Sequence, residues 1–245
     1  MFCALLSLCG PLPASQGCRP CDEPLQGVQR VVDGDTLVLE NGEKIRLIGI
    51  NTPELGHRGN PDQPGAVAAR DALDRLVQAS GGRLRVCPGS EPRDRYGRLL
   101  AHLRSRDGED VVYRLLRQGW GYSIAIPPNL GSLECHLAAE NQAHDLHLGV
   151  WRRAAVDSES LNGDESGFYH LTGRVVRVGE SRRSIWLNLR GGLALRINRQ
   201  AWRYFDFEDP QQLQGRALEV RGWITRQNRT QRISVHHPSA IRWLD

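Results

Sequence analysis

Lysine is almost missing from this chain of 245 residues. Lys44 is the single example, and arginine supplies the rest of the 32 basic side chains. Such a uniform preference for arginine fits a codon bias of the whole genome, so arginine content alone does not identify a nucleic-acid-binding protein. The hydrophobic fraction of 40% and the charged fraction of 24% are ordinary for a soluble globular protein.

A long apolar run is also missing from the N-terminus. The run in residues 1–10 is too short to cross a bilayer, so we expect no stable membrane span. It resembles the apolar part of a secretory signal, with small and polar residues up to Gly17. We therefore expect residues 1–17 to be a signal segment and the protein to be exported, periplasmic or secreted. No basic residues precede the run, so a disordered or core-packed N-terminus is the alternative. A cysteine directly after residue 17, Cys18, also allows a lipid-anchored form, but residues 15–17 match the lipoprotein recognition sequence poorly.

A second Cys-x-x-Cys motif and the context of a thioredoxin are missing too. Neither a zinc site nor a redox pair is therefore favoured at Cys18-Arg-Pro-Cys21. Without residues 1–17 the chain keeps four cysteines, and an even number in an exported chain predicts disulfides. Three pairings stay open, and free thiols are the alternative. The candidate disulfide cysteines are Cys18, Cys21, Cys87 and Cys135.

The charge is unevenly spread along the chain. Residues 168–245 contain 14 arginines and six acidic residues, a net charge of +8, which leaves −4 for residues 1–167. Residues 154–167 are polar, small and acidic without an apolar period, which predicts a linker. We expect one domain at 24–153 and a basic domain at 168–245, with an anionic partner such as nucleic acid for the latter.

The apolar periodicity predicts a mainly β protein with α-helices (α+β). In the first half we expect strands at 27–32, 36–39, 44–50, 83–87 and 99–104 and helices at 65–78, 111–118 and 132–147. In the second half we expect strands at 169–178, 185–189, 193–197, 217–225 and 231–235, with a helical patch at 199–205. Five strands with a helix between the third and fourth are typical of an OB-fold.

Side chains suited to chemistry concentrate in residues 30–40 and 46–54. Asp35, Arg46, Asn51 and Glu54 lie there, separated by apolar residues with the pattern of β-strands. A strand alternates its side chains between two faces, so these polar groups can be aimed into one pocket while their neighbours fill a core. Side-chain oxygens that can bind a metal ion, the guanidinium of an arginine and a second carboxylate together suit metal-assisted phosphodiester hydrolysis.

Four motifs occur in an order that resembles the staphylococcal nuclease (thermonuclease) family. They are Asp33-Gly-Asp-Thr36, the stretch from Arg46 to Glu54, Asp94-Arg-Tyr-Gly-Arg98 and Leu116-Arg-Gln-Gly119. The resemblance covers about half of the chain, residues 28–151. It implies a calcium-dependent phosphodiesterase built on a five-stranded OB-type barrel with helices, followed here by a second small OB-like β-barrel.

The resemblance also implies roles for particular residues. A glutamate at this place suits a general base, and arginines present planar forks that fit phosphate oxygens. The implied metal ligands are Asp35, Asn51 and the backbone carbonyl of Thr52, the implied catalytic residues are Arg46, Glu54 and Arg98, and the implied substrate contacts are Arg95 and Tyr96.

Two departures from the family pattern bear on function. The founding member has Asp where this chain has Asn51, and a neutral amide ligand should lower the affinity for Ca²⁺. Ala125 and Pro127-Pro128 stand where that member stacks nucleotides on tyrosines, with Tyr122 nearby. We therefore expect base contacts that are weaker or displaced.

The resulting hypothesis is an exported, monomeric, Ca²⁺-dependent endonuclease of DNA and RNA with low sequence specificity, whose C-terminal domain assists nucleic-acid binding. One alternative is a non-catalytic nucleic-acid-binding or scaffold protein with a nuclease-like domain. In another alternative, the basic half binds a protein or a cell-envelope polymer.

A zinc site on the last helix of the first half is not favoured. Cys135, His136, His144 and His147 share this predicted helix, but their spacing matches no known zinc site, so a polar helix face is favoured.

Overall fold

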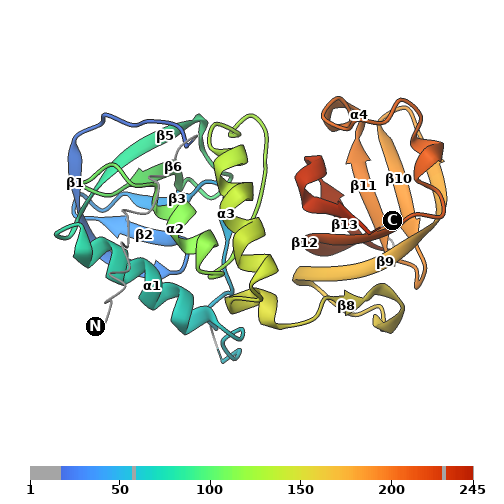
Figure 1. The fold of residues 1–245 in the computed structure, drawn as a ribbon, viewed down its shortest axis with the longest axis horizontal. Coiled ribbons are helices and arrows are strands. Elements are labelled where there is room, and N and C mark those ends of the chain that lie inside the picture. The colour runs from blue at the N-terminus through green and yellow to red at the C-terminus, as the bar shows by residue number, and fades with distance from the viewer. Residues whose placement is uncertain (1–17, 57–58, 228–229, 245) are drawn as a thin grey trace, which may run out of the picture.

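The computed structural model describes residues 18–56, 59–227 and 230–244. Two β-barrels lie side by side, the first blue to green and the second orange to red (Figure 1). The predicted signal segment, residues 1–17, lies outside the described residues. Among the helices that are described, none is long and apolar enough to pass through a membrane.

The first barrel closes in the strand order β1-β2-β3-β6-β5. Its β3 and β6 run parallel, whereas the other neighbouring strands are antiparallel. A two-stranded ladder, β4 with β7, lies outside this barrel. The bounds are β1 (Leu25–Asp33), β2 (Thr36–Leu39), β3 (Lys44–Leu47), β4 (Ile50–Asn51), β5 (Arg83–Arg93), β6 (Leu99–Arg104) and β7 (Tyr122–Ser123).

The alternation along β3 decides what faces the core and what faces outward. Ile45 and Leu47 are buried in the barrel, so the side chain of Arg46 between them projects from the other face. Three helices cover the barrel, and the first packs through small residues such as Ala69 and Ala72, which permit close approach. They are α1 (Ala66–Ala79), α2 (Val111–Arg117) and α3 (Leu133–Asp145), followed by the 3₁₀ helix η1 (Gly149–Arg152).

Two disulfides fasten the segment before β1 to the first barrel. Cys18 bonds Cys135 of α3 with a Cα–Cα distance of 5.1 Å, and Cys21 bonds Cys87 of β5 with a Cα–Cα distance of 6.0 Å. The bonds join residues 117 and 66 positions apart. Closing loops of this length restricts the unfolded chain and stabilises the fold by about 4 kcal/mol per bond.

The second barrel closes because β12 pairs with both β13 and β9. Its strand order is β9-β10-β11-β13-β12, and β14 and β8 extend it. This agrees with the predicted OB-like arrangement, with α4 and η3 between the third and fourth strands. The bounds are β8 (Val156–Asp157), η2 (Ser158–Ser160), β9 (Gly167–Glu180), β10 (Ser184–Leu189), β11 (Ala194–Asn198), α4 (Arg199–Trp202), η3 (Pro210–Leu213), β12 (Ala217–Gln227), β13 (Thr230–Val235), η4 (Pro238–Ala240) and β14 (Ile241–Trp243).

The structure differs from the predicted elements at several ends. The strand expected at 44–50 is interrupted, because Gly49 has a φ of +93°, a conformation that breaks a strand. The strand expected to end at Cys87 continues to Arg93. Within the predicted linker, β8 pairs with β9 and Ser158 is fully buried, so this stretch is partly ordered by the second barrel. The short strand β14 was not predicted.

Helix α3 connects the two barrels through a buried ion pair. It lies on the side of the first barrel that faces β12 (Figure 1). The Arg221 guanidinium of β12 pairs with the Glu140 carboxylate of α3, and Arg221 Nε donates to the Ser123 carbonyl at 3.1 Å. Ser123 N donates in turn to Glu140 Oε1 at 2.6 Å. Burial raises the pKa of Glu140, and Arg221 opposes that effect.

Removing Arg221 should therefore destabilise the protein strongly. In Arg221→Met, Glu140 stays buried without its cation, and we expect a loss of about 3–5 kcal/mol in the free energy of unfolding at pH 7, measured by urea titration. The loss should be smaller at pH 5, because protonation removes the buried charge of Glu140. Adding Glu140→Gln should restore most of the stability.

Arg226→Met is the matched control, because its ion pair with Asp164 is exposed. We expect little change in unfolding for this variant. Equal losses for Arg221→Met and Arg226→Met would contradict the structural role of the buried pair.

Candidate active site

The predicted site residues converge at one edge of the first barrel. Asp35 lies in the turn between β1 and β2, Arg46 lies on β3, and Asn51 lies on β4. Gly34 allows this turn to approach its neighbours closely, since a Cβ there would lie 2.7 Å from both the Ala69 Cβ and the Thr52 Oγ1. Three separate elements thus bring their polar groups to one place.

Asp35 is held by hydrogen bonds on both carboxylate oxygens. Its Oδ2 accepts from the Thr52 backbone N–H at 2.9 Å and from the Thr52 hydroxyl at 3.3 Å. Its Oδ1 accepts only from the Thr36 hydroxyl, at 3.1 Å, among the contacts of the described residues. A carboxylate oxygen offers two lone pairs, so Oδ1 keeps capacity for a further ligand.

Arg46 joins Asp35 to the segment that carries Asn51. Its Nη2 lies 3.1 Å from Asp35 Oδ2 and donates to Asn51 Oδ1 at 3.3 Å. Its Nη1 donates to the carbonyls of Leu47 at 2.6 Å and Ile50 at 2.8 Å. The side chain is only 11% exposed. The guanidinium is therefore fixed in orientation by carbonyls on one side and by the two predicted metal-binding side chains on the other.

Three carboxylates in this region repel one another. Burial and the charge of Asp35 raise the pKa of Asp33 to about 6. Burial, Asp35 and Asp33 likewise raise the pKa of Glu54, against the opposing charges of Arg46 and Arg98. Such mutual repulsion leaves a negative potential that a cation would relieve.

The backbone of Glu54 is fixed by a two-way contact with Gln63. The Glu54 N–H donates to Gln63 Oε1 at 2.9 Å, and the Gln63 N–H donates to the Glu54 carbonyl at 2.9 Å. Residues 57–58, between them, lie outside the described part of the chain. Gln63 was not among the predicted site residues, and a pattern of residue types contains no signal for it.

A tight turn between β5 and β6 presents Arg98, and Asp94 organises this turn. Asp94 Oδ1 accepts from the backbone N–H groups of Tyr96 at 2.9 Å and Arg98 at 3.0 Å, and Oδ2 accepts from Arg98 Nε at 2.6 Å. Burial opposes ionisation of Asp94, but these hydrogen bonds outweigh it and lower the pKa. Asp94 is part of a quoted motif, and the structure identifies it as the residue that orients Arg98.

Arg46 and Arg98 line the same cavity of about 450 Å³. Arg95 and Tyr96 also line it, and the Tyr96 side chain is 68% exposed, with the Arg95 Cζ 4.8 Å from its ring centroid. Trp223 of the second barrel completes the lining together with apolar residues that include Ile124. From the sequence, Trp223 is most simply a core or half-buried aromatic, although one or two of the four tryptophans in the second half could stack bases on an open barrel face; its place in this cavity is not predictable from the sequence.

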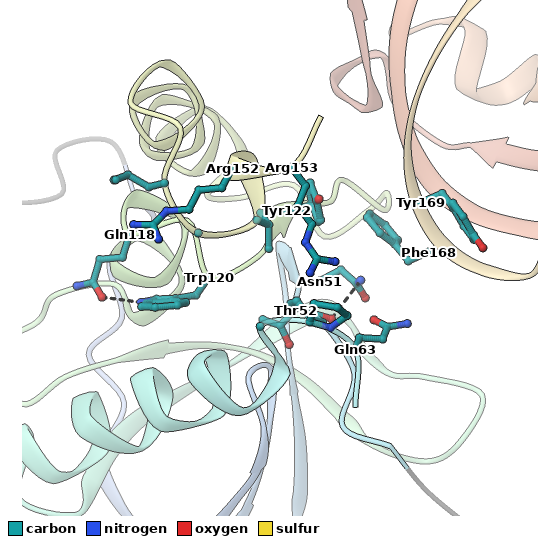
Figure 2. Close-up of a pocket in the computed structure, with 16 residues that line it drawn as sticks. Asn51, Thr52, Gln63, Gln118, Trp120, Tyr122, Arg152, Arg153, Phe168 and Tyr169 are labelled. Carbon is teal, nitrogen blue, oxygen red and sulfur yellow. Dashed lines mark hydrogen bonds between the residues drawn. The ribbon is translucent and has the colours of Figure 1, made fainter. Parts of the chain in front are cut away.

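Asn51 and Thr52 line a second, larger cavity of about 730 Å³ (Figure 2). Arg152 and Arg153 project over it, and Phe168 enters it from β9 (Figure 2). The two predicted metal-binding residues Asn51 and Thr52 are buried and line one cavity, whereas Arg46 and Arg98 line the other. The predicted site residues are thus divided between the linings of two cavities.

The residues on α3 do not form a zinc site. The sulfur atoms of Cys135 and Cys18 are bonded to each other, so neither is available as a thiolate ligand. His136 is buried with Nε2 3.2 Å from Asp110 Oδ1. His144 packs against Trp151 with a ring-centroid distance of 4.8 Å, and its Nε2 lies 3.8 Å from Glu219 Oε2 of β12 in the second barrel. Cys135 and His136 are buried, so this part of α3 differs from the polar helix face expected from the sequence.

The closed five-stranded barrel and the cluster of acids and arginines define a nuclease-like protein of the OB type. The family model described as "Staphylococcal nuclease homologue" matches residues 44–153. The chain is 33% identical over 129 residues to the thermonuclease of Staphylococcus intermedius, a match that covers 51% of this chain and 75% of that protein. It is 30% identical over 141 residues to the thermonuclease of Staphylococcus hyicus, covering 56% and 81%.

A third relative is the endonuclease YhcR of Bacillus subtilis, which is 32% identical over 134 residues, covering 51% of this chain and 11% of that protein. The chain therefore belongs to the staphylococcal nuclease family. This confirms the family resemblance, and with it the predicted fold class and the class of enzyme. The matching family segment ends at residue 153, before the second barrel.

Proposed function

We propose that the protein is a divalent-metal-dependent nuclease that hydrolyses the phosphodiester bonds of DNA and RNA with low sequence specificity. The observation that carries the proposal is the convergence of Asp35, Arg46 and Asn51 beside a cavity that Arg98 also lines. The family membership of the chain supports the same activity.

The donor set around Asp35 fits a hard cation. It offers a carboxylate with a free lone pair, an amide oxygen at Asn51 and a backbone carbonyl at Thr52, and Ca²⁺ accepts all three kinds of oxygen. The carboxylate of Asp33, whose pKa is raised by burial and by the charge of Asp35, adds negative potential at the same place when it is ionised. Asp35, Asn51 and Thr52 would hold the ion, which supplies neutralisation of phosphate charge when bound.

The remaining residues act on the phosphate and on the attacking water. Glu54 accepts a proton from the water, and its raised pKa makes it a better base than an ordinary glutamate. Arg46 and Arg98 donate to non-bridging phosphate oxygens and stabilise the added charge of the five-coordinate transition state. Asp94 positions Arg98 for that contact. No base edge has to be read, because each of these contacts is to the backbone of the substrate.

Substitution of the base and of the outer arginine tests this activity. Purified protein with Ca²⁺ should cut single-stranded DNA and RNA, and chelation should abolish cutting until Ca²⁺ is restored. We expect Glu54→Gln to lower kcat by roughly 10²- to 10⁴-fold and Arg98→Ala by roughly 10²- to 10³-fold.

Asp74→Asn and Arg75→Ala are the matched controls, because both side chains lie exposed on α1. They should retain full activity. If the wild-type protein bound nucleic acid without cutting it under any divalent ion, a non-catalytic binding or scaffold function would replace the proposal.

The neutral ligand Asn51 should set the metal affinity. Asn51→Asp adds a negative charge beside Asp35, and we expect the Ca²⁺ concentration for half-maximal activity to fall by about tenfold. Isothermal calorimetry of Ca²⁺ binding should show the same shift. Asn41→Asp, in the exposed turn between β2 and β3, is the control and should leave Ca²⁺ binding unchanged. Weaker Ca²⁺ binding by Asn51→Asp would exclude Asn51 as a ligand.

For the C-terminal barrel we propose that it assists by holding nucleic acid electrostatically. Its net charge of +8 supports this, as does a cavity of about 390 Å³ lined by Arg177, Trp186 and Arg232. Binding of single-stranded DNA to the Glu54→Gln protein should weaken steeply with salt, and Arg177→Gln with Arg232→Gln should flatten the slope of log K against log salt by about 1.4. If binding of single-stranded DNA did not depend on the salt concentration, a protein or a cell-envelope polymer would be favoured as the partner of this barrel.

For location we propose an oxidising compartment outside the cytoplasm. The two disulfides support it, since such bonds persist where thiols are not kept reduced. Fractionation of producing cells tests the location, and recovery in the cytoplasm would contradict it.

A further inference from the structure

Trp223 is an aromatic side chain of the second barrel that lies in the catalytic cavity of the first. It lines the cavity together with Arg46 and Arg98 and is 38% exposed. Within the described residues, Tyr96 and Trp223 are the aromatic side chains of this lining, and the segment after Gly119 contributes Ile124 and Ile126. A cavity that is lined by a partly exposed indole and by Arg46 and Arg98 suits a ligand with both an anionic group and a flat apolar ring.

The position of the indole is fixed by its own strand. Trp223 pairs with Phe168 across β12 and β9, and their ring centroids lie 4.8 Å apart in an edge-to-face contact. Residues two apart on a strand share a face, so Trp223 and Arg221 both point from β12 toward the first barrel. Arg221 is anchored there by Glu140 and by the Ser123 carbonyl. This anchor fixes the distance between the indole and the arginines of the site.

The pairing of Trp223 with Phe168 also links the two cavities. Phe168 lines the larger cavity beside Asn51, and Trp223 lines the smaller one beside Arg46. Figure 2 shows Phe168 entering the larger cavity from the second barrel. The contact between the two rings thus connects the lining of one cavity with the lining of the other.

We propose that Trp223 is the stacking wall for a nucleobase next to the phosphate that is cleaved, so that the second barrel completes the substrate site. The inference rests on the proposed nuclease function. A nucleobase presents a flat face to the indole while its phosphate meets Arg46 and Arg98, and such stacking is independent of sequence because every base has a π-face. Tyr96 closes the same cavity from the β5–β6 turn. A base in a duplex is already stacked and paired, so this contact favours unpaired nucleotides.

Stacking and a merely structural role are separated by removing the base instead of the indole. The substrates are a dinucleotide with a single internal phosphodiester and its two analogues in which one base is replaced by hydrogen. For wild type we expect kcat/KM to fall by about 10- to 100-fold for one of the two analogues. With Trp223→Leu, kcat/KM for the intact dinucleotide should be lower than in wild type by the same factor. For the analogue that lacks the stacked base, kcat/KM of Trp223→Leu should equal that of wild type.

Three variants make the outcome decisive. Trp223→Phe keeps a ring and should recover most of the activity, and it covers the case in which Trp223→Leu does not fold. Trp202→Leu removes a half-buried indole of the second barrel that stacks on Phe205 and lines neither cavity of the site, and it should not change cleavage of the dinucleotide. Wild-type levels of cleavage by Trp223→Leu, or an equal loss with and without the base, would overturn the assignment.

The proposed function fails in a different way. If the activity itself is wrong, wild type cleaves none of these substrates. If only the role of Trp223 is wrong, wild type cleaves them and Trp223→Leu behaves like wild type.

Discussion

The site depends above all on the placement of one guanidinium. Arg46 bonds two carbonyls of the connection between β3 and β4 and contacts the oxygens of Asp35 and Asn51. Without it, the buried carboxylate of Asp35 would lie near Asp33 and Glu54 without its ion pair, and the turn that carries Asp35 would be destabilised. The same guanidinium nitrogen, Nη2, contacts both Asp35 Oδ2 and Asn51 Oδ1 and so holds these two oxygens near each other. Folding and the proposed chemistry therefore depend on the same few hydrogen bonds.

The barrel makes this placement possible by alternation. Ile45 and Leu47 enter the core, so the residue between them must point outward, toward β4. Gly49 then reverses the chain with a positive φ and lets Asn51 return beside Arg46. The second barrel is added to this unit through α3. Its buried Arg221–Glu140 pair holds β12 close enough for Trp223 to reach the cavity.

Much of this arrangement is predictable from local sequence. Alternating apolar residues and four ordered motifs predict the first barrel and the grouping of Asp35, Arg46 and Asn51. Five short strands with a helical patch suffice for an OB-like second half. These features depend on neighbours along the chain or on a family resemblance.

What could not be predicted depends on contacts between distant segments. The pairing of Cys18 with Cys135 spans 117 residues, and the four cysteines allowed three pairings. Glu140 looks like one more polar residue on a helix until Arg221, 81 positions away, is placed against it. Trp223 resembles any half-buried aromatic in a barrel, because its exposure to the cavity is set by how the barrels meet. The strand β8 lies in a stretch whose composition is that of a linker, and it is ordered only by pairing with β9.

The most direct measurement is a crystal structure of the Glu54→Gln protein with Ca²⁺ and a short single-stranded DNA. We expect Ca²⁺ bound by Asp35, Asn51 and the Thr52 carbonyl, one phosphate held by both Arg46 and Arg98, and the neighbouring base against Trp223. A strand bound only to the second barrel, or a Ca²⁺ ion held away from Asp35, would contradict it.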